Sequence, residues 1–331
     1  MATIIGLSHK KKLLKIYEMA LLIRKTEEMI AEKYREGQMR CPVHLSIGQE
    51  LSSAIISQIV KKKDFFIGSH RSHAHFLAKG GSINKMIAEI YGKETGCSSG
   101  KGGSMHLIDL KVNFMGSSAI VGNSIPIGVG LGFSIKLKKN NKQLSLIFFG
   151  DAAVEEGVFY ESLNFAILKK LPVIFVCENN YYSVYSSLKD RQPKNRKIFN
   201  MVKNFGIKSY FFNLNNPLDN FLKLSKIFSK VREKQEPVFI EFSTYRWREH
   251  CGSDYDNNLN YRSKKEFNRQ VKNDSIVKLK NFLLKDDSMK RDFIDKIEKK
   301  IDQKISNAFS FAKRSKFPNT LNAFNGVYAK T

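Results

Sequence analysis

The chain has 331 residues, of which 42% are hydrophobic, and it carries a formal net charge of +25. This length exceeds a typical single domain, although an α/β chain of this size can form one large core with helical additions. Its four cysteines are scattered without a CxxC pair, and no apolar run approaches about 18 residues. We therefore expect no zinc site, disulfide framework or membrane span.

The basic excess is spread along the chain. Lysine runs at 10–12 and 61–63, and the Lys-rich segment 262–316, are interleaved with Asp, Glu and Asn, as on solvated helix faces. No nucleic-acid-binding signature accompanies them, so we do not expect a nucleic-acid partner. The N-terminal sequence lacks the apolar segment of a secretory signal, and we predict a cytoplasmic location.

The first predicted element is an amphipathic helix over about residues 10–37, ending near Gly37. Residues 38–245 alternate helical and apolar strand patterns, with strands expected at about Lys208–Asn213 and Val238–Phe242. From Lys264 the pattern is charged and helical, and residues 315–331 are expected to form an extended tail. The predicted organisation is an N-terminal helical segment (1–37), an α/β domain (38–262) and a helical C-terminal region with a tail (263–331).

The segment between residues 144 and 180 predicts a β-α-β unit. Leu144–Phe149 is almost continuously apolar and is closed by Gly150, and Val173–Cys177 repeats this pattern, as expected of strands buried on both faces of a parallel sheet. Between them, Phe159, Leu163, Ala166 and Ile167 recur at helical spacing.

A right-handed crossover would bring Asp151 and Asn180 to the same carboxyl edge of the sheet, where open α/β sheets bind ligands. A carboxylate, an amide oxygen and a backbone carbonyl from the following turn, at Tyr182, suit Mg²⁺. The alternative is an ordinary β-α-β unit with a turn Asp and a turn Asn. The ordered Gly-Asp and Glu-Asn-Asn elements favour the metal site.

Two glycine-rich segments differ from known nucleotide motifs. Gly96–Gly102 has one residue too few for a P-loop and lacks Ser or Thr after its Lys. In Gly128–Gly132 the third glycine comes one position too early for a dinucleotide fingerprint, and no strand directly precedes it. We interpret the first as a turn, with Ser104 and His106 as candidate contributors to a site, and the second as close helix packing.

Several motifs occur in order between about Tyr17 and Arg262. They are HLSIGQE (His44–Glu50), HRSH (His70–His73), GCSSGKGGSMH (Gly96–His106), AIVGNSIPIG (Ala119–Gly128), the Asp151 to Asn180 unit and TYRWREH (Thr244–His250). Together they resemble the thiamine-diphosphate-dependent 2-oxo acid dehydrogenases, specifically the alpha subunit of the pyruvate or acetoin dehydrogenase type. The resemblance implies a three-layer, parallel-sheet, thiamine-diphosphate-binding fold with helical N- and C-terminal extensions.

The resemblance also implies roles for individual residues toward thiamine diphosphate and Mg²⁺. Arg71 matches an arginine that binds the diphosphate, and His70 stands where a tyrosine is usual. The carbonyl of Ala119 and the amide of Val121 match main-chain groups that hold the aminopyrimidine ring. Arg246 is assigned to the diphosphate or to anchoring the loop that closes over it.

Catalytic candidates by the same resemblance are His250, near substrate and intermediate, together with His44 and His73. A structural role for His73 remains an alternative. The common Gly-Asp-Gly is Gly-Asp-Ala here, so Ala152, with Ala153, would present backbone N–H groups to the diphosphate. The usual His-Gly-His-Ser is replaced by Arg248–Cys251.

In this family the glutamate that activates the cofactor belongs to a separate beta subunit with a pyrimidine-binding domain. No second α/β domain is evident here, so we expect an alpha2-beta2 assembly that decarboxylates a 2-oxo acid and passes the acyl group to a lipoyl acyltransferase. Two alternatives remain open. The first is a non-oxidative carboligase or split transketolase-like subunit, and the second is a non-catalytic interaction subunit.

Overall fold

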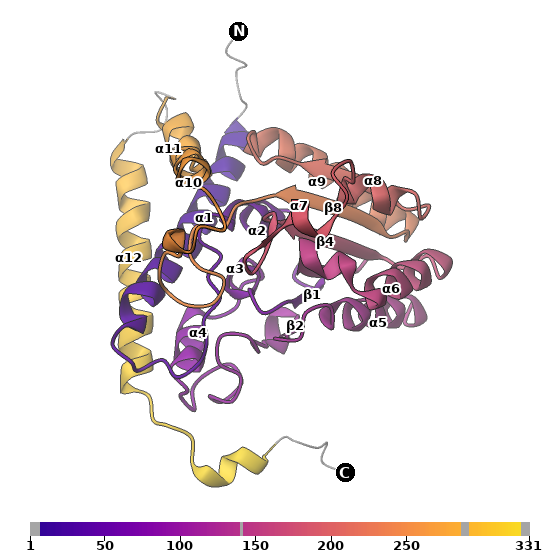
Figure 1. The fold of residues 1–331 in the computed structure, drawn as a ribbon. Coiled ribbons are helices and arrows are strands. Elements are labelled where there is room, and N and C mark those ends of the chain that lie inside the picture. The colour runs from indigo at the N-terminus through magenta and orange to yellow at the C-terminus, as the bar shows by residue number, and fades with distance from the viewer. Residues whose placement is uncertain (1–6, 140–141, 286–290, 326–331) are drawn as a thin grey trace.

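The computed structural model describes residues 7–139, 142–285 and 291–325 (Figure 1). Within them, a six-stranded sheet has the order β2-β1-β3-β4-β8-β7, and all of its strand pairs are parallel. The strands are β1 (Phe65–Gly68), β2 (Phe114–Ser117), β3 (Ser145–Gly150), β4 (Val173–Asn179), β7 (Lys208–Phe212) and β8 (Val238–Ser243). A separate antiparallel hairpin pairs β5 (Tyr182–Ser183) with β6 (Ser186–Ser187).

The described chain has helices on both faces of this sheet and further helices packed around these. They are α1 (Leu7–Tyr34), α2 (Glu50–Ser57), α3 (His73–Ala78), α4 (Ile83–Ile90), α5 (Ser124–Leu137), α6 (Gly157–Leu168), α7 (Leu188–Arg191), α8 (Ile198–Lys203), α9 (Pro217–Lys234), α10 (Lys264–Lys272), α11 (Ser275–Leu284) and α12 (Arg291–Arg314). Figure 1 shows α5 and α6 side by side, while α12 runs alongside α1 at the opposite side of the molecule. Within the described part of the chain, no helix combines the length and the apolar character needed to span a bilayer.

The alternation of side chains along the strands explains the three layers. Leu146 and Phe148 of β3 belong to a core shared with α1–α4, α9, α11 and α12. Their neighbours Ile147 and Phe149 point to the other face and pack with α5, α6 and α8. A strand buried on both faces must be apolar at consecutive positions, as these strands are. The predicted α/β fold class is therefore confirmed.

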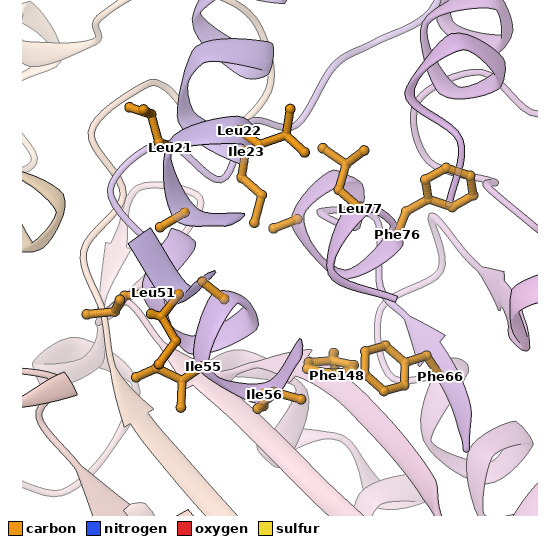
Figure 2. Close-up of a cluster of buried hydrophobic side chains, with 14 of the residues drawn as sticks. Leu21, Leu22, Ile23, Leu51, Ile55, Ile56, Phe66, Phe76, Leu77 and Phe148 are labelled. Atoms are coloured by element: carbon orange, nitrogen blue, oxygen red, sulfur yellow. The ribbon is translucent and has the colours of Figure 1, made fainter. Parts of the chain in front are cut away.

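The helices α1, α2 and α3 form much of the core that contains Leu146 and Phe148. Figure 2 shows Leu21 to Ile23 of α1 facing Leu51, Ile55 and Ile56 of α2, with Phe76 and Leu77 of α3 beside them. Below these helices, Phe66 of β1 and Phe148 of β3 lie against one another, with ring centroids 4.9 Å apart. This packing holds α3, and the loop that precedes it, over the carboxyl edge of the sheet.

The predicted helix at residues 10–37 and the strands at 144–149, 173–177, 208–213 and 238–242 are confirmed within a few residues. The expectation of an extended tail from residue 315 is wrong at Thr320–Phe324, which form a short 3-10 helix. The side chain of Asn319 accepts a hydrogen bond from the N–H of Leu321 at 3.0 Å and so starts this helix. Residues 326–331 of that tail lie outside the described residues.

The strand order creates a switch point between β1 and β3. The chain leaves β1 for β2 on one side and leaves β3 for β4 on the other, so the loops after β1 and β3 diverge at the carboxyl edge. In open α/β sheets, such a divergence leaves a crevice in which ligands bind. Asp151 follows β3 and Asn180 follows β4, which places both at this edge, as predicted.

Two of the glycines in Gly128–Gly132 allow α5 to lie close to the sheet. A Cβ atom at Gly128 would stand 2.3 Å from Cγ1 of Ile147, and one at Gly132 would stand 2.4 Å from Cγ2 of Val173. A Cβ atom at Gly130 would meet nothing within 4 Å. The interpretation of this segment as close helix packing is therefore confirmed for the first and third glycines.

These contacts predict opposite effects for two alanine substitutions. Gly128→Ala should lower the free energy of unfolding by about 1–3 kcal/mol, because the added methyl overlaps the strand side chains. Gly130→Ala should leave it unchanged or raise it by up to about 1 kcal/mol, since alanine has the higher helix propensity. Urea denaturation of both variants measures the difference. Equal stability of the two would contradict the packing argument.

Candidate functional site

A cavity of about 130 Å³ lies at the carboxyl edge of β1, β3 and β4. It is lined from five loops, with the main contributions from Ser69–Arg71, Val121–Gly122, Asp151–Ala153, Asn180 with Tyr182, and His250. The loops after β1 and β3 supply two of these walls, so the cavity occupies the switch point of the sheet. Most of the residues that the sequence singled out are thereby brought together.

Asp151 and Asn180 meet on one wall of the cavity. The Asp151 side chain is buried, with the residue 1% exposed, and burial raises the pKa of its carboxyl. Asn180 donates from Nδ2 to Oε1 of Gln49 at 3.3 Å, and its Oδ1 accepts from the N–H of Tyr182 at 3.1 Å. Gln49, which also accepts from the Thr244 hydroxyl at 3.1 Å, was not predicted as a site residue, although it lies within the HLSIGQE motif.

Arg191 is a further residue that sequence reasoning missed. Its guanidinium forms an ion pair with Oδ2 of Asp151 and a second with Oε1 of Glu155 at 2.5 Å. Burial raises the pKa of Asp151, while the adjacent Arg191 acts in the opposite direction by favouring the carboxylate. Nothing in the local pattern around residue 191 signals this contact, because the partner is 40 positions away.

Arg71 connects two loops of the site. It donates from Nη1 to the carbonyl of Leu45 at 2.7 Å and from Nη2 to the carbonyl of His250 at 3.0 Å. Burial lowers the pKa of Arg71 to about 9, and the nearby Arg246 adds to this effect. The side chain therefore stays charged at neutral pH and places a buried positive charge in the cavity wall.

Three imidazoles, those of His44, His70 and His250, gather beside Arg71. Their ring centroids are 4.7 to 5.3 Å apart, and candidate ligand nitrogens of the three lie within 4.8 Å of one another. Burial, reinforced by Arg71, lowers the pKa of His44 to about 2 and those of His70 and His250 to about 3. The spacing would permit a metal ion, but the neighbouring guanidinium disfavours a second cation there. Neutral donors around a fixed positive charge suit an anion better.

The other two histidines of the HRSHAH segment have partners within the chain. Nδ1 of His73 lies 3.1 Å from Glu27 and its Nε2 lies 2.7 Å from the Ser104 hydroxyl. Nε2 of His75 lies 2.9 Å from Glu178, and its ring stacks on Phe148. The three imidazoles of this segment, those of His70, His73 and His75, therefore do not converge on one point.

Glu89 organises the glycine-rich turn at residues 96–103. Its Oε2 accepts from the N–H groups of Ser98 at 2.7 Å and Gly100 at 3.0 Å, and its Oε1 accepts from Gly102 at 2.7 Å. Gly100 and Gly103 adopt positive φ, which side chains disfavour. These N–H groups therefore donate to the Glu89 carboxylate and are not available to bind a phosphate. His106 is exposed, whereas Ser104 is buried beneath this turn.

Arg246 ties the His250 loop to the β5–β6 hairpin. Its guanidinium donates to the carbonyls of Arg248 at 2.8 Å and Val184 at 3.0 Å, and it lies 3.7 Å from the Asp256 carboxylate. Arg246 is buried and is not among the described residues that line the cavity. Its contacts are therefore those of a loop anchor.

Of the remaining residues that were predicted to contact the cofactor, some line the cavity and others lie beside it. Val121, Ala152 and Ala153 line the cavity, while Ala119 precedes the first of these in the same loop and is not among the described lining residues. Ala152 does not have positive φ, so alanine at this position requires no left-handed backbone conformation. The Tyr182 hydroxyl donates to Glu266 at 2.8 Å, and the Tyr182 N–H donates to Asn180. The backbone carbonyl of Tyr182 is therefore the group that could bind a metal.

These residues fit both a hard cation and an anion. The Asp151 carboxylate and the Asn180 amide oxygen are ligands that Mg²⁺ accepts. Arg71 offers charge, and Nδ1 of His70 is buried without a hydrogen-bond partner among the described residues. A diphosphate that carries Mg²⁺ would satisfy the metal ligands, the guanidinium and this nitrogen together.

The depressed histidine pKa values predict that acid destabilises the fold. Between about pH 6.5 and about pH 3, an unfolded histidine binds a proton that the folded His70 does not bind, so acidification lowers the free energy of unfolding. The slope is up to about 1.4 kcal/mol per pH unit for each such histidine. In urea titrations across this range, His70→Gln should make the pH dependence shallower than that of the wild type. An unchanged slope would contradict burial of His70 as the cause.

A family model described as Dehydrogenase E1 component matches residues 17–321. The chain is 34% identical over 319 residues to the pyruvate dehydrogenase E1 component subunit alpha of Rickettsia bellii, with 96% of each protein covered. It is 34% identical over 316 residues to the protein of that name from Porphyra purpurea, covering 94% of this chain and 91% of the relative. The chloroplastic pyruvate dehydrogenase E1 component subunit alpha-3 of Arabidopsis thaliana is 34% identical over 325 residues, and the match covers 97% of this chain and 75% of the relative. The matched region includes every residue that lines the cavity.

Proposed function

The chain belongs to the dehydrogenase E1 component family, and we propose that it acts as the alpha subunit of a pyruvate dehydrogenase-type enzyme. Membership implies a thiamine-diphosphate-dependent 2-oxo acid dehydrogenase activity that is carried out together with a beta subunit. The observation that supports this function most directly is the single cavity at the switch point, which brings Asp151, Asn180 and Arg71 together. Pyruvate is the first substrate to test, since the relatives are named for it.

For the cofactor, we assign the metal and the diphosphate to separate walls of the cavity. The Asp151 carboxylate, the Asn180 amide oxygen and the backbone carbonyl of Tyr182 would bind Mg²⁺, which takes its other ligands from phosphate and water. Arg71 would hold the diphosphate and His70 would donate a hydrogen bond to it from its orphaned nitrogen.

The backbone supplies further contacts. The N–H groups of Ala152 and Ala153 would face the diphosphate, and the main chain at Ala119 and Val121 would hold the aminopyrimidine ring. When bound, thiamine diphosphate supplies the electron sink that a 2-oxo acid needs to lose CO₂.

The histidines in and around the cavity divide into two groups by their partners. His250 and His44 are neutral at physiological pH and have ring positions near Arg71, so they can donate or accept a hydrogen bond beside a reacting group. His73 is held between Glu27 and Ser104, so we assign it to positioning the turn and helix around the site. Arg246 would keep the His250 loop closed against the hairpin, which limits access of water.

The acidic residues of the cavity support the need for a beta subunit. The two carboxylates in its wall are both engaged within the described chain, since Asp151 is paired with Arg191 and Glu178 contacts His75 and Ser52. Neither is free to serve as the acidic group that activates the cofactor. We propose that this group comes from the beta subunit in an alpha2-beta2 assembly, and that the acyl product is passed to a lipoyl acyltransferase.

Reconstitution with the cognate beta subunit tests this function. The pair should release CO₂ from pyruvate and reductively acylate an oxidised lipoyl domain, whose disulfide accepts the electrons, in the presence of Mg²⁺ and thiamine diphosphate, whereas the lone chain should show neither activity. Full activity of the lone chain would contradict the need for the beta subunit. Carboligation without transfer to lipoyl groups would instead support the non-oxidative alternative, and cofactor binding without turnover by the pair would support a non-catalytic subunit.

A further inference from the structure

Arg191 occupies the carboxylate that the proposed metal requires. Its Nη2 pairs with Oδ2 of Asp151, its Nη1 lies 2.5 Å from Oε1 of Glu155, and its Nε donates to the carbonyl of Ser186 at 3.3 Å. The Arg191 side chain is 12% exposed and that of Asp151 is 1% exposed. The guanidinium thus seals Asp151 from solvent on this side.

The segment that carries Arg191 begins at the metal motif itself. Asn180 is followed by the β5–β6 hairpin and then by α7, whose last residue is Arg191. Within it, Tyr181 and Val184 adopt positive φ, a costly conformation for a β-branched residue such as valine. The hairpin is held by a hydrogen bond from the N–H of Leu188 to the carbonyl of Tyr181 at 2.7 Å and by Arg246 at Val184. The second metal ligand and Arg191 therefore lie on one continuous, constrained unit.

The charge of Asp151 must be balanced whether or not a metal is bound. A buried carboxylate without a counter-charge is costly, and Arg191 supplies that charge. Mg²⁺ would need the same carboxylate oxygens, and two cations in contact with one carboxylate repel each other. Resting on the function proposed above, we propose that Arg191 is a positioning residue that holds Asp151 before the cofactor arrives and yields it when Mg²⁺ binds.

The contacts of Arg191 argue against a direct role at the diphosphate. All three of its nitrogen positions have partners on the protein, and Arg191 is not among the described residues that line the cavity, whereas Arg71 is. Glu155, whose side chain is 33% exposed, offers a place where the guanidinium can remain after it leaves Asp151. Arg191 therefore competes with the metal without having to leave the site altogether.

The test compares Arg191→Ala, Arg191→Lys and the control Arg196→Ala in chain reconstituted with the beta subunit. Arg196 is an exposed arginine on the same segment, so its removal changes the net charge equally. Calorimetry would measure the Mg²⁺ concentration that gives half-maximal binding of thiamine diphosphate. We expect Arg191→Ala to lower this concentration by about tenfold, a typical size for coupling between two binding events. Arg191→Lys, which keeps the charge, should stay near the wild type, and Arg196→Ala should have no effect.

A second readout separates competition from simple damage. Without cofactor, Arg191→Ala should melt at a lower temperature than the wild type, because Asp151 loses its partner, and saturating Mg²⁺ with thiamine diphosphate should restore most of the difference. An unchanged or higher half-maximal Mg²⁺ concentration in Arg191→Ala would overturn the inference while leaving the proposed function intact, provided that the wild type binds. Failure of the wild-type assembly to bind thiamine diphosphate with Mg²⁺ would overturn both.

Discussion

Replacing Asp151 with asparagine should weaken Mg²⁺-dependent binding of thiamine diphosphate by at least about 100-fold, the scale expected when one member of a buried charged contact is removed. The substitution keeps the shape of the side chain but removes the only charge that the proposed metal ligands carry. It also removes one of the two carboxylates that pair with Arg191, so the positive charge of this guanidinium is less fully balanced beside the metal. Calorimetric titration of the reconstituted assembly at several Mg²⁺ concentrations measures this loss.

Two companion variants make this result specific. Asn180→Ala should weaken binding in the same direction, since it removes the second oxygen ligand. Glu155→Gln also removes a carboxylate that contacts Arg191, but this carboxylate is not a proposed ligand, so its effect should be smaller than that of either ligand variant. Affinity that is unchanged in both ligand variants would rule out the metal assignment. The opposite signs expected for Asp151→Asn and Arg191→Ala distinguish loss of a ligand from loss of a competitor.

Replacing Arg71 with alanine should reduce the affinity for thiamine diphosphate by about 100-fold, because a buried charged contact with the anion is lost. The same change removes two hydrogen bonds that hold the carbonyls of Leu45 and His250. Arg71→Lys keeps a charge but cannot reproduce the fork that reaches both carbonyls, so it should recover only part of the affinity. Raising the Mg²⁺ concentration should not restore cofactor binding in either variant, whereas it should do so in a variant in which only a metal ligand is weakened.

The control for Arg71 is an arginine that contacts the loop containing His250 from outside. Arg35 pairs with Asp254 of that loop at 2.7 Å, and its side chain is 73% exposed. Exposed pairs contribute little, so Arg35→Ala should leave cofactor affinity close to the wild-type value. Equal losses in the Arg35 and Arg71 variants would indicate that loop order in general, and not the buried guanidinium, determines binding.

Sequence reasoning located most of the cavity but missed the strand that positions one of its walls. Phe65–Gly68 was not predicted as a strand, although its three apolar residues lie between Asp64 and the Ser69–Arg71 loop. Only four residues long, it offers too little periodicity to be told from a loop. Once it is placed between β2 and β3, the position of His70 and Arg71 at the switch point follows.

Features that depend on neighbours along the chain could be predicted from the amino-acid sequence alone. The apolar strands around Asp151 and Asn180, the helix between them and the order of motifs are readable because alternation and helical spacing are local properties. A parallel crossover then places both side chains at one edge for purely topological reasons. Close helix packing at Gly128 and Gly132 was likewise predicted from the local glycine pattern.

Which charges and rings meet could be seen only in the folded chain. The contact of Arg71 with the His250 carbonyl joins residues 179 positions apart, and that of Arg191 with Asp151 joins residues 40 apart. Such pairs are selected by the packing of loops above a sheet edge and by the cost of leaving a buried charge unpaired, and neither leaves a periodic trace in the sequence. For this reason the motif around Asp151 indicated a metal site, whereas the arginine that now balances its charge became visible only in the fold.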